Sequence, residues 1–528
     1  VLVCLLHWSY APDQRRYLYI ASFLFGICFN NHQTLIVAAM GLEVAIAAIN
    51  PKLGRDAFFI NVVFFVAGLV LKSMGVLTSF DQNAPLYFIY IAVGVGSIAA
   101  WAYLTYQTNS MLTEWKSVLI TLGAWLLGAA FYFYMPIASA TNPPMNWGYP
   151  RTFDGFIHAF TRGQYEKTNP SNIFVDPFRF LLQLKMYFEG AIDEFHLVYL
   201  LLALVPFVFF VRMQKRERAW IVGNTAVYAC LAFLLLILLN PLVDRQSRDL
   251  TRVFFTASHV TIAMFLGYGL TLLGAYLVTH YQQTRPYALY GAAVAAAVGL
   301  YSLAARVQEV YGHLAGEHGG IGLLFHGLGQ AFRHPSFTAP VHAIYAALFV
   351  LIVALVFLGG VLLHRTRLRP EFALACFAVM PFFAPLSHWA ANEQRGHLFG
   401  YWFGHDMFEP PFGLYPPMTR NAVLYGGTDP GRFCPTYMIF CESFIKPEQR
   451  RNPAFDRRDV YIITQNALAD GTYLNYIRAH YNRSAQVDPP FLRDAVLYVQ
   501  TIVMGKREAE KRLNGQVYRM NGLARSVG

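Results

Sequence analysis

The loop Thr141–Arg151, which reads T-N-P-P-M-N-W-G-Y-P-R, combines side chains that could bind a sugar or a phosphate. Its three prolines fix their own φ angles and favour extended backbone in the residues before them, so the loop is stiff. Asn142 and Asn146 supply amide groups. Trp147 supplies a large ring, and Arg151 supplies a planar guanidinium that matches phosphate oxygens. The alternative is that the loop only caps helix ends, with Trp147 as an anchor at the membrane surface.

A second polar cluster, Asn31 and His32, interrupts the apolar stretch 17–49. Polar groups between apolar runs are costly unless they are hydrogen-bonded or used in function. These two residues are therefore candidates for substrate binding. The alternative is that they cap helices and hydrogen-bond between them.

A third cluster is the run D-R-Q-S-R-D at 244–249, followed by Arg252. Arg248 and Arg252 could bind a lipid-linked phosphate through bidentate contacts, and Asp249 lies beside them. The alternative is a self-neutralised salt-bridge loop at the membrane surface. Three arginines here oppose the usual excess of basic residues on the cytoplasmic side, and a bound phosphate would account for them.

The composition places these clusters in a membrane protein. The chain is 56% hydrophobic and only 13% charged, against about 25% charged in an average soluble domain. Its net charge of +11 comes from basic clusters in short loops, where such residues set membrane orientation, so no nucleic-acid partner is predicted. The chain has no H-E-x-x-H, cysteine cage or G-x-S-x-G motif, so no metal site is predicted; a divalent metal requirement is left open.

Apolar runs recur along the chain and predict a mainly α polytopic bundle of about 11 to 12 spans. The runs are 1–10, 17–29, 34–49, 57–77, 85–104, 117–137, 195–211, 220–240, 253–279, 288–304, 341–363 and 371–387. The second and third runs are shorter than a full span, so they could be short tilted helices or one hairpin that enters the membrane. Basic residues at 15–16, 52–55, 212–218 and 365–369 all fall on one side of this count, which we assign to the cytoplasm. The loop 138–194 and the chain after 388 then lie outside.

The C-terminal part, 388–528, is predicted to be a small extracytoplasmic α/β domain that follows a transmembrane domain at 1–387. Residues 421–425 and 460–464 have strand composition, and 436–444 and 472–481 suit helices. The strand–helix–strand–helix order suggests a small α/β domain on the outer face.

Three strings of residues together resemble a family of polytopic bacterial membrane proteins catalogued as a domain of unknown function. They are G-I-C-F-N-N-H-Q-T-L (Gly26–Leu35), Y-M-P-I-A-S-A-T-N-P-P-M-N-W-G-Y-P-R-T (Tyr134–Thr152) and R-D-L-T-R-V-F-F (Arg248–Phe255). That family is related to an animal transmembrane protein O-mannosyltransferase and is placed in the GT-C superfamily of glycosyltransferases. The resemblance covers about residues 1–280, and the C-terminal part resembles an extended form found in some bacterial members.

The resemblance implies a GT-C-like enzyme of the bacterial inner membrane that moves a sugar, expected to be mannose, from a polyprenyl-phosphate carrier to an acceptor hydroxyl on a protein or glycan. In that superfamily the catalytic acid lies in the first outer loop. Because the chain begins with Val1 and its first ten residues read like the end of a membrane helix, we expect that acid upstream of Val1.

The resemblance assigns the residues of the three clusters to substrate and carrier binding; they are Asn31, His32, Asn142, Asn146, Trp147, Arg151, Arg248 and Asp249, and Arg252 joins them from its position in the third cluster. Two other classes of function remain as alternatives. One is a transporter or lipid flippase, and the other is a non-catalytic scaffold whose outer domain binds a partner.

Overall fold

The computed structural model describes residues 1–528 except 76, 78, 164–168, 336–337, 428, 465–470, 483, 485 and 505–528. The described part is mainly helical, and nine of its helical segments are long and apolar enough to cross a membrane. This chain is therefore an integral membrane protein with a polytopic helical bundle. The nine segments are Pro51–Ser73, Ala84–Thr108, Trp115–Ala140, Pro177–Arg212, Lys215–Leu239, Arg245–Thr279, Tyr281–Leu314, Ala339–Leu363 and Pro370–Asn392.

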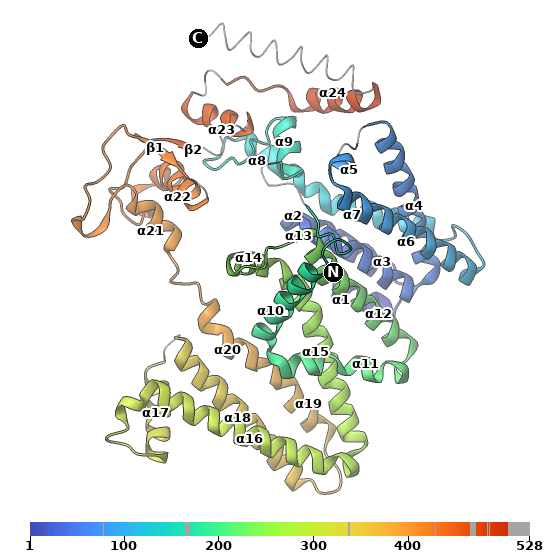
Figure 1. Cartoon of the computed structure of the whole chain (residues 1–528), viewed down its shortest axis with the longest axis vertical. Coiled ribbons are helices and arrows are strands. Elements are labelled where there is room, and N and C mark those ends of the chain that lie inside the picture. The colour runs from blue at the N-terminus through green and yellow to red at the C-terminus, as the bar shows by residue number, and fades with distance from the viewer. Residues whose placement is uncertain are drawn as a thin grey trace.

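Figure 1 shows the arrangement of the helices along the chain. In the first half they are α1 (Leu2–Tyr10), α2 (Arg16–Asn31), α3 (Ala38–Ile49), α4 (Pro51–Ser73), α5 (Ser79–Gln82), α6 (Ala84–Thr108), α7 (Trp115–Ala129), α8 (Tyr134–Ala140), α9 (Phe153–Phe160), α10 (Pro177–Ala203), α11 (Val205–Phe209), α12 (Lys215–Ala229) and α13 (Leu235–Leu239). In the second half they are α14 (Arg245–Thr251), α15 (Thr256–Thr279), α16 (Tyr281–Tyr311), α17 (Ile321–Arg333), α18 (Ala339–Leu363), α19 (Pro370–Val379), α20 (Phe383–Asn392), α21 (Phe399–Asp406), α22 (Asp429–Phe440), α23 (Gly471–Tyr481) and α24 (Phe491–Met504).

The count of spans is lower than the 11 to 12 expected, because the first three apolar runs form shorter helices. Among the described residues, α1 has 9 residues, α2 has 16, and the stretch Gln33–Ile49 combines a 3-10 turn with the 12 residues of α3. At 1.5 Å per residue, helices of this length fall short of a membrane core of about 30 Å.

The short helix α2 packs closely on α7 through two glycines. A Cβ atom on Gly26 would lie 2.3 Å from the Trp125 carbonyl oxygen, and one on Gly128 would lie 2.2 Å from the Phe23 carbonyl oxygen. The Asn30 amide donates to the carbonyls of Gly26 and Gly128 at 2.8 and 2.9 Å. Small residues allow two backbones to approach in this way, and an amide can then link them.

Several long helices begin at an Asn or Asp followed by proline. Asn50 accepts from the Leu53 amide at 3.1 Å before Pro51, and Asp176 accepts from the Arg179 amide at 2.9 Å before Pro177. The side-chain oxygen satisfies a free amide at the helix start, and proline has no amide to satisfy. The sequence therefore marks these helix starts locally.

Two contacts between loops show which loops lie together at each end of the first helices. Arg15 pairs with Glu114 at 3.1 Å, at the end where α4 also begins. At the other end, the Gln33 amide donates to the Phe160 carbonyl at 2.7 Å. Arg55 was expected in a basic loop, but it lies within α4. Its side chain is fully buried and pairs with Asp56 at 2.6 Å. Which end is cytoplasmic stays a prediction.

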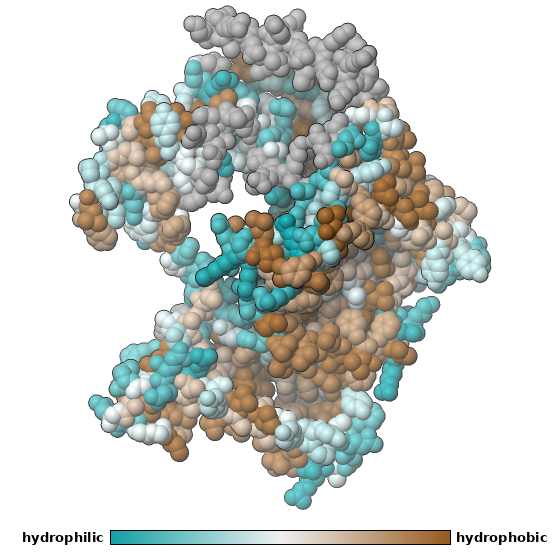
Figure 2. Space-filling view, viewed as in Figure 1, coloured by the Kyte–Doolittle hydropathy of each residue, from teal (hydrophilic) through white to brown (hydrophobic). Residues whose placement is uncertain are grey.

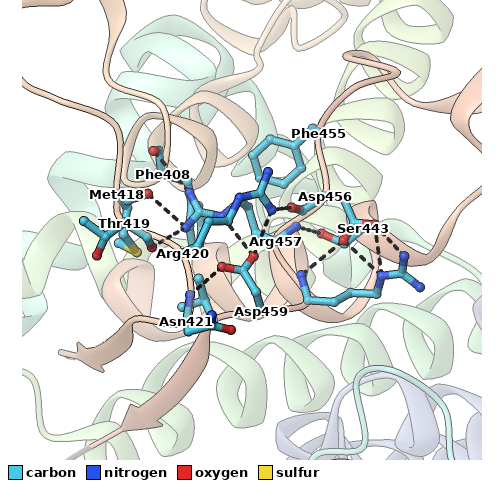
Figure 3. A network of polar contacts seen from close by, with 12 residues as sticks. Phe408, Met418, Thr419, Arg420, Asn421, Ser443, Phe455, Asp456, Arg457 and Asp459 are labelled. Atoms are coloured by element: carbon cyan, nitrogen blue, oxygen red, sulfur yellow. Dashed lines mark hydrogen bonds and ion pairs between the residues drawn. The ribbon is translucent and has the colours of Figure 1, made fainter.

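The two predicted strands are present as β1 (Val423–Gly426) and β2 (Tyr461–Thr464), and they pair in parallel with Val423 opposite Tyr461. The first predicted helix begins earlier than expected, at Asp429, and ends at Phe440. Figure 3 shows how Arg457 holds this region together from within: it donates to the carbonyls of Met418 and Thr419 at 3.1 and 2.9 Å and lies 3.4 Å from Asp459.

The core around this small sheet does not consist of C-terminal residues alone. It contains Phe408, Met438, Phe455 and Ile462, but also Tyr149, whose side chain is fully buried and comes from the loop after α8. The last membrane helix also runs on to Asn392, past the predicted boundary at 387. The C-terminal region is thus packed against the loop 141–151.

Candidate functional site

Arginines and carboxylates meet where α14 lies against α10. Asp244 caps α14 by accepting from the Ser247 amide at 2.8 Å, and the helix then places Arg248 and Arg252 one turn apart on the same face. Three acids of α10 and a histidine of α15 complete what we call the arginine–carboxylate cluster: Arg248, Arg252, Glu189, Asp193, Glu194 and His259. Figure 2 shows hydrophilic surface at the position of α14, beside hydrophobic helix surface and facing the opening below α21 and α22.

Each arginine of the cluster already has a carboxylate partner. Arg248 lies 2.7 Å from Asp193 and 3.7 Å from Glu189, and the Nε of Arg252 lies 3.6 Å from Glu194. The two arginine side chains are 35% and 42% exposed, so both reach solvent. A guanidinium has five N–H donors, and these contacts leave some of them for a further anion.

Glu194 links the arginines to a buried histidine. Its Oε2 lies 2.5 Å from Nδ1 of His259, which is only 5% exposed and lies between the rings of Tyr187 and Phe195. Within the described part of the chain, Nε2 of His259 is buried without a hydrogen-bond partner. Arg252 and His259 therefore hold the Glu194 carboxylate in one orientation from two sides.

The backbone beside Glu194 is strained. His196 has φ 60° and ψ 150° inside α10, a region that side chains other than glycine rarely adopt at a cost of about 1–3 kcal/mol. Its ring stacks on His388 of α20 at 5.7 Å, and Nε2 of His388 donates to the Glu194 carbonyl at 2.9 Å. Strain of this kind is concentrated at binding and catalytic sites, which singles out this part of α10.

The loop 141–151 faces the C-terminal region instead of the cluster. Nε of Arg151 lies 3.0 Å from Asp488, which also accepts from the Tyr149 hydroxyl at 3.0 Å. The Trp147 ring lies under the guanidinium of Arg432 at 4.2 Å. These contacts agree with the capping alternative, in which the loop holds other segments in place.

The two asparagines of this loop are also engaged. Asn142 has φ 54° and donates to the Ala479 carbonyl at 3.5 Å. Asn146 is 4% exposed and accepts from the Ser139 hydroxyl at 2.7 Å. Both thus stabilise the loop itself or its contact with α23.

The remaining predicted residues lie nearer to the cluster. The His32 ring makes an edge contact with Phe254, two residues after Arg252, at 5.4 Å. Burial lowers the pKa of His32, and the positive charge of Arg162 lowers it further. Asn31 ends α2 and is exposed, as is Asp249. The structure therefore divides the predicted residues into a loop group, from Asn142 to Arg151, and a group around α14.

Glu189, Asp193, Glu194 and His259 are not among the site residues predicted from the sequence. A signal was present, because these ionisable residues lie within two of the nine membrane-length segments, Pro177–Arg212 and Arg245–Thr279. Ionisable groups inside such segments are rare and usually functional. Among the residues that the structure describes, no group of three or more His, Cys, Asp or Glu side chains is arranged to hold a metal ion.

Comparison with protein-family models, with curated proteins and with solved structures gave no match. The resemblance of the three strings to a family therefore stays a prediction, and the site is described from its own geometry.

Proposed function

We propose that this protein is a glycosyltransferase of the bacterial inner membrane, similar to O-mannosyltransferases of the GT-C superfamily. It would move a sugar from a polyprenyl-phosphate carrier to an acceptor hydroxyl on the outer face, where the C-terminal region would also lie. The observation that carries this proposal is the pair Arg248 and Arg252, one helical turn apart and exposed at the end of the bundle. The proposal places this end of the bundle at the membrane surface, where a carrier phosphate lies above its apolar chain.

The chemistry requires the bond between the sugar carbon and the phosphate oxygen to break as the acceptor oxygen attacks. Charge builds up on the leaving phosphate, and guanidinium groups stabilise such charge when they are already in place. Asp193 and Glu189 keep Arg248 in position before the carrier arrives, and Glu194 does the same for Arg252. His32 borders the same region through Phe254.

In this proposal Glu194 and His259 are positioning residues, because their contacts are with Arg252 and with each other. The loop 141–151 also takes a positioning role, since its polar groups contact the C-terminal region.

The test is sugar transfer by the protein with a polyprenyl-phosphate sugar as donor. Arg248→Ala and Arg252→Ala should each lower kcat/KM by about 100-fold, the usual order for loss of one group that stabilises charge in the transition state. Arg248→Lys should retain part of the activity, because lysine keeps the charge but loses bidentate contact.

The matched control is Arg306→Ala, because Arg306 is 51% exposed and also pairs with an acid, Glu309, but lies on α16. Its activity should equal that of the unmodified protein. Full transfer by both Arg248→Ala and Arg252→Ala would show that these arginines do not bind the carrier phosphate. Movement of the sugar lipid across vesicles without transfer would instead favour the transporter alternative.

A further inference from the structure

An open pocket with a volume of about 510 Å³ lies at the end of α20, next to the arginine–carboxylate cluster. Its lining residues are Pro385, His388, Trp389, Asn392, Glu393 and Arg395. His388 connects the two sites, because its Nε2 donates to the Glu194 carbonyl at 2.9 Å while its ring borders the pocket. The pocket thus adjoins the cluster through one side chain.

The pocket lining suits a sugar ring. A pyranose has apolar C–H faces and a rim of hydroxyl groups, and proteins bind it with an aromatic face and planar polar side chains. Trp389 is 44% exposed and supplies such a face. Asn392, which donates to the His388 carbonyl at 3.0 Å, supplies an amide.

An ion pair completes the polar rim of the pocket. Arg395 contacts both carboxylate oxygens of Glu393, with Nη2 at 2.6 Å. This pair places a carboxylate and a guanidinium side by side at the pocket edge, and both kinds of group hydrogen-bond to hydroxyls. The pocket therefore combines one indole ring with three polar side chains at its edge, which is a suitable lining for a neutral ligand rich in hydroxyl groups.

The strained backbone of His196 gives a second, independent observation. Its ring stacks on His388 at 5.7 Å, so the strained residue supports the side chain that separates the pocket from Glu194. Backbone strain persists where the surrounding structure fixes it, and it gathers at binding and catalytic sites. The strain therefore lies at the junction of pocket and cluster.

We propose that the α20 pocket binds a pyranose ring, with Trp389 against the apolar face of the sugar and Asn392, Glu393 and Arg395 at its hydroxyls. The ring would belong to a substrate of the proposed sugar transfer, on which this assignment rests, and it would be either the acceptor glycan or the donor sugar. The competing role for Trp389 is an anchor at the membrane surface, which needs no ligand.

The test is the binding of methyl α-mannopyranoside to the protein in detergent, measured by saturation-transfer NMR. Trp389→Ala should weaken binding by about tenfold, the effect of losing one aromatic contact. Asn392→Ala, a second and milder change, should weaken binding about threefold. The matched control is Trp402→Ala, because Trp402 is 43% exposed and lies on α21, outside the pocket.

Kinetics then identify the source of the ring. If Trp389→Ala raises KM for the acceptor, the pocket binds the acceptor, and if it raises KM for the lipid-linked donor, the pocket binds the donor sugar. Unchanged glycoside binding by both Trp389→Ala and Asn392→Ala would overturn the assignment, and so would an equal loss with Trp402→Ala. If the protein binds the glycoside through Trp389 but shows no transfer activity, the proposed function is refuted. The assignment of the pocket as a sugar-binding site then still stands.

Discussion

The carboxylate of Asp488 holds the loop 141–151 against the C-terminal region, so Asp488→Asn is a direct test of what this loop does. Asp488 contacts the Tyr149 hydroxyl and Nε of Arg151, both at 3.0 Å. The side chains of Arg151 and Asp488 are only 24% and 18% exposed, so solvent screens the contacts weakly. A hydrogen bond to a charged group contributes about 1.5–3 kcal/mol, against about 1 kcal/mol for a neutral one. Loss of the charge at two such bonds should therefore cost the docked loop about 2 kcal/mol.

Hydrogen exchange of the complete protein in detergent measures this cost as local opening. A change of about 2 kcal/mol corresponds to about 30-fold faster exchange of the amides between 146 and 160. Glu309→Gln is the control, because its pair with Arg306 is more than half exposed and should contribute less than about 1 kcal/mol. Exchange that stays within about twofold of the unmodified protein in Asp488→Asn would refute the assigned role of this carboxylate.

Two further predictions concern stability. Arg55→Ala should lower the free energy of unfolding by about 3–5 kcal/mol, because it leaves Asp56 buried without its partner. Thermal denaturation in detergent should show this loss, whereas Arg15→Ala, at a partly exposed pair, should cost about 1 kcal/mol or less; equal effects would contradict the assignment. Burial, followed by the negative charge of Asp488, raises the pKa of Tyr149 from 10.0 to about 12. The folded protein holds this proton more tightly than the unfolded chain, so the stabilisation is complete below about pH 10 and is lost as pH rises toward 12. Limited proteolysis of the loop from pH 9 to 12 should show this loss in the unmodified protein and not in Tyr149→Phe.

Elements that depend on local composition could be predicted well. The apolar runs from 57 onward gave the nine membrane-length helices, and the strands at 423–426 and 461–464 were expected within two residues. A run of apolar residues forms a helix in a membrane because every backbone group must be satisfied within the segment. The first three runs, 1–10, 17–29 and 34–49, do not form helices of membrane length, because each has fewer than the roughly 20 residues that a spanning helix needs.

The sequence by itself determined that this chain crosses a membrane many times and that arginines lie at one end of the bundle, since both follow from residue type and order. Only the tertiary structure decided the partners of those arginines. Glu194 meets His259 across 65 positions, and Asn142 meets Ala479 across 337. It likewise showed that Arg55 is a buried structural charge and that Arg151 pairs with Asp488. The physical reason is that an ion pair depends on the packing of helices distant in the sequence, which the local pattern around either partner does not contain.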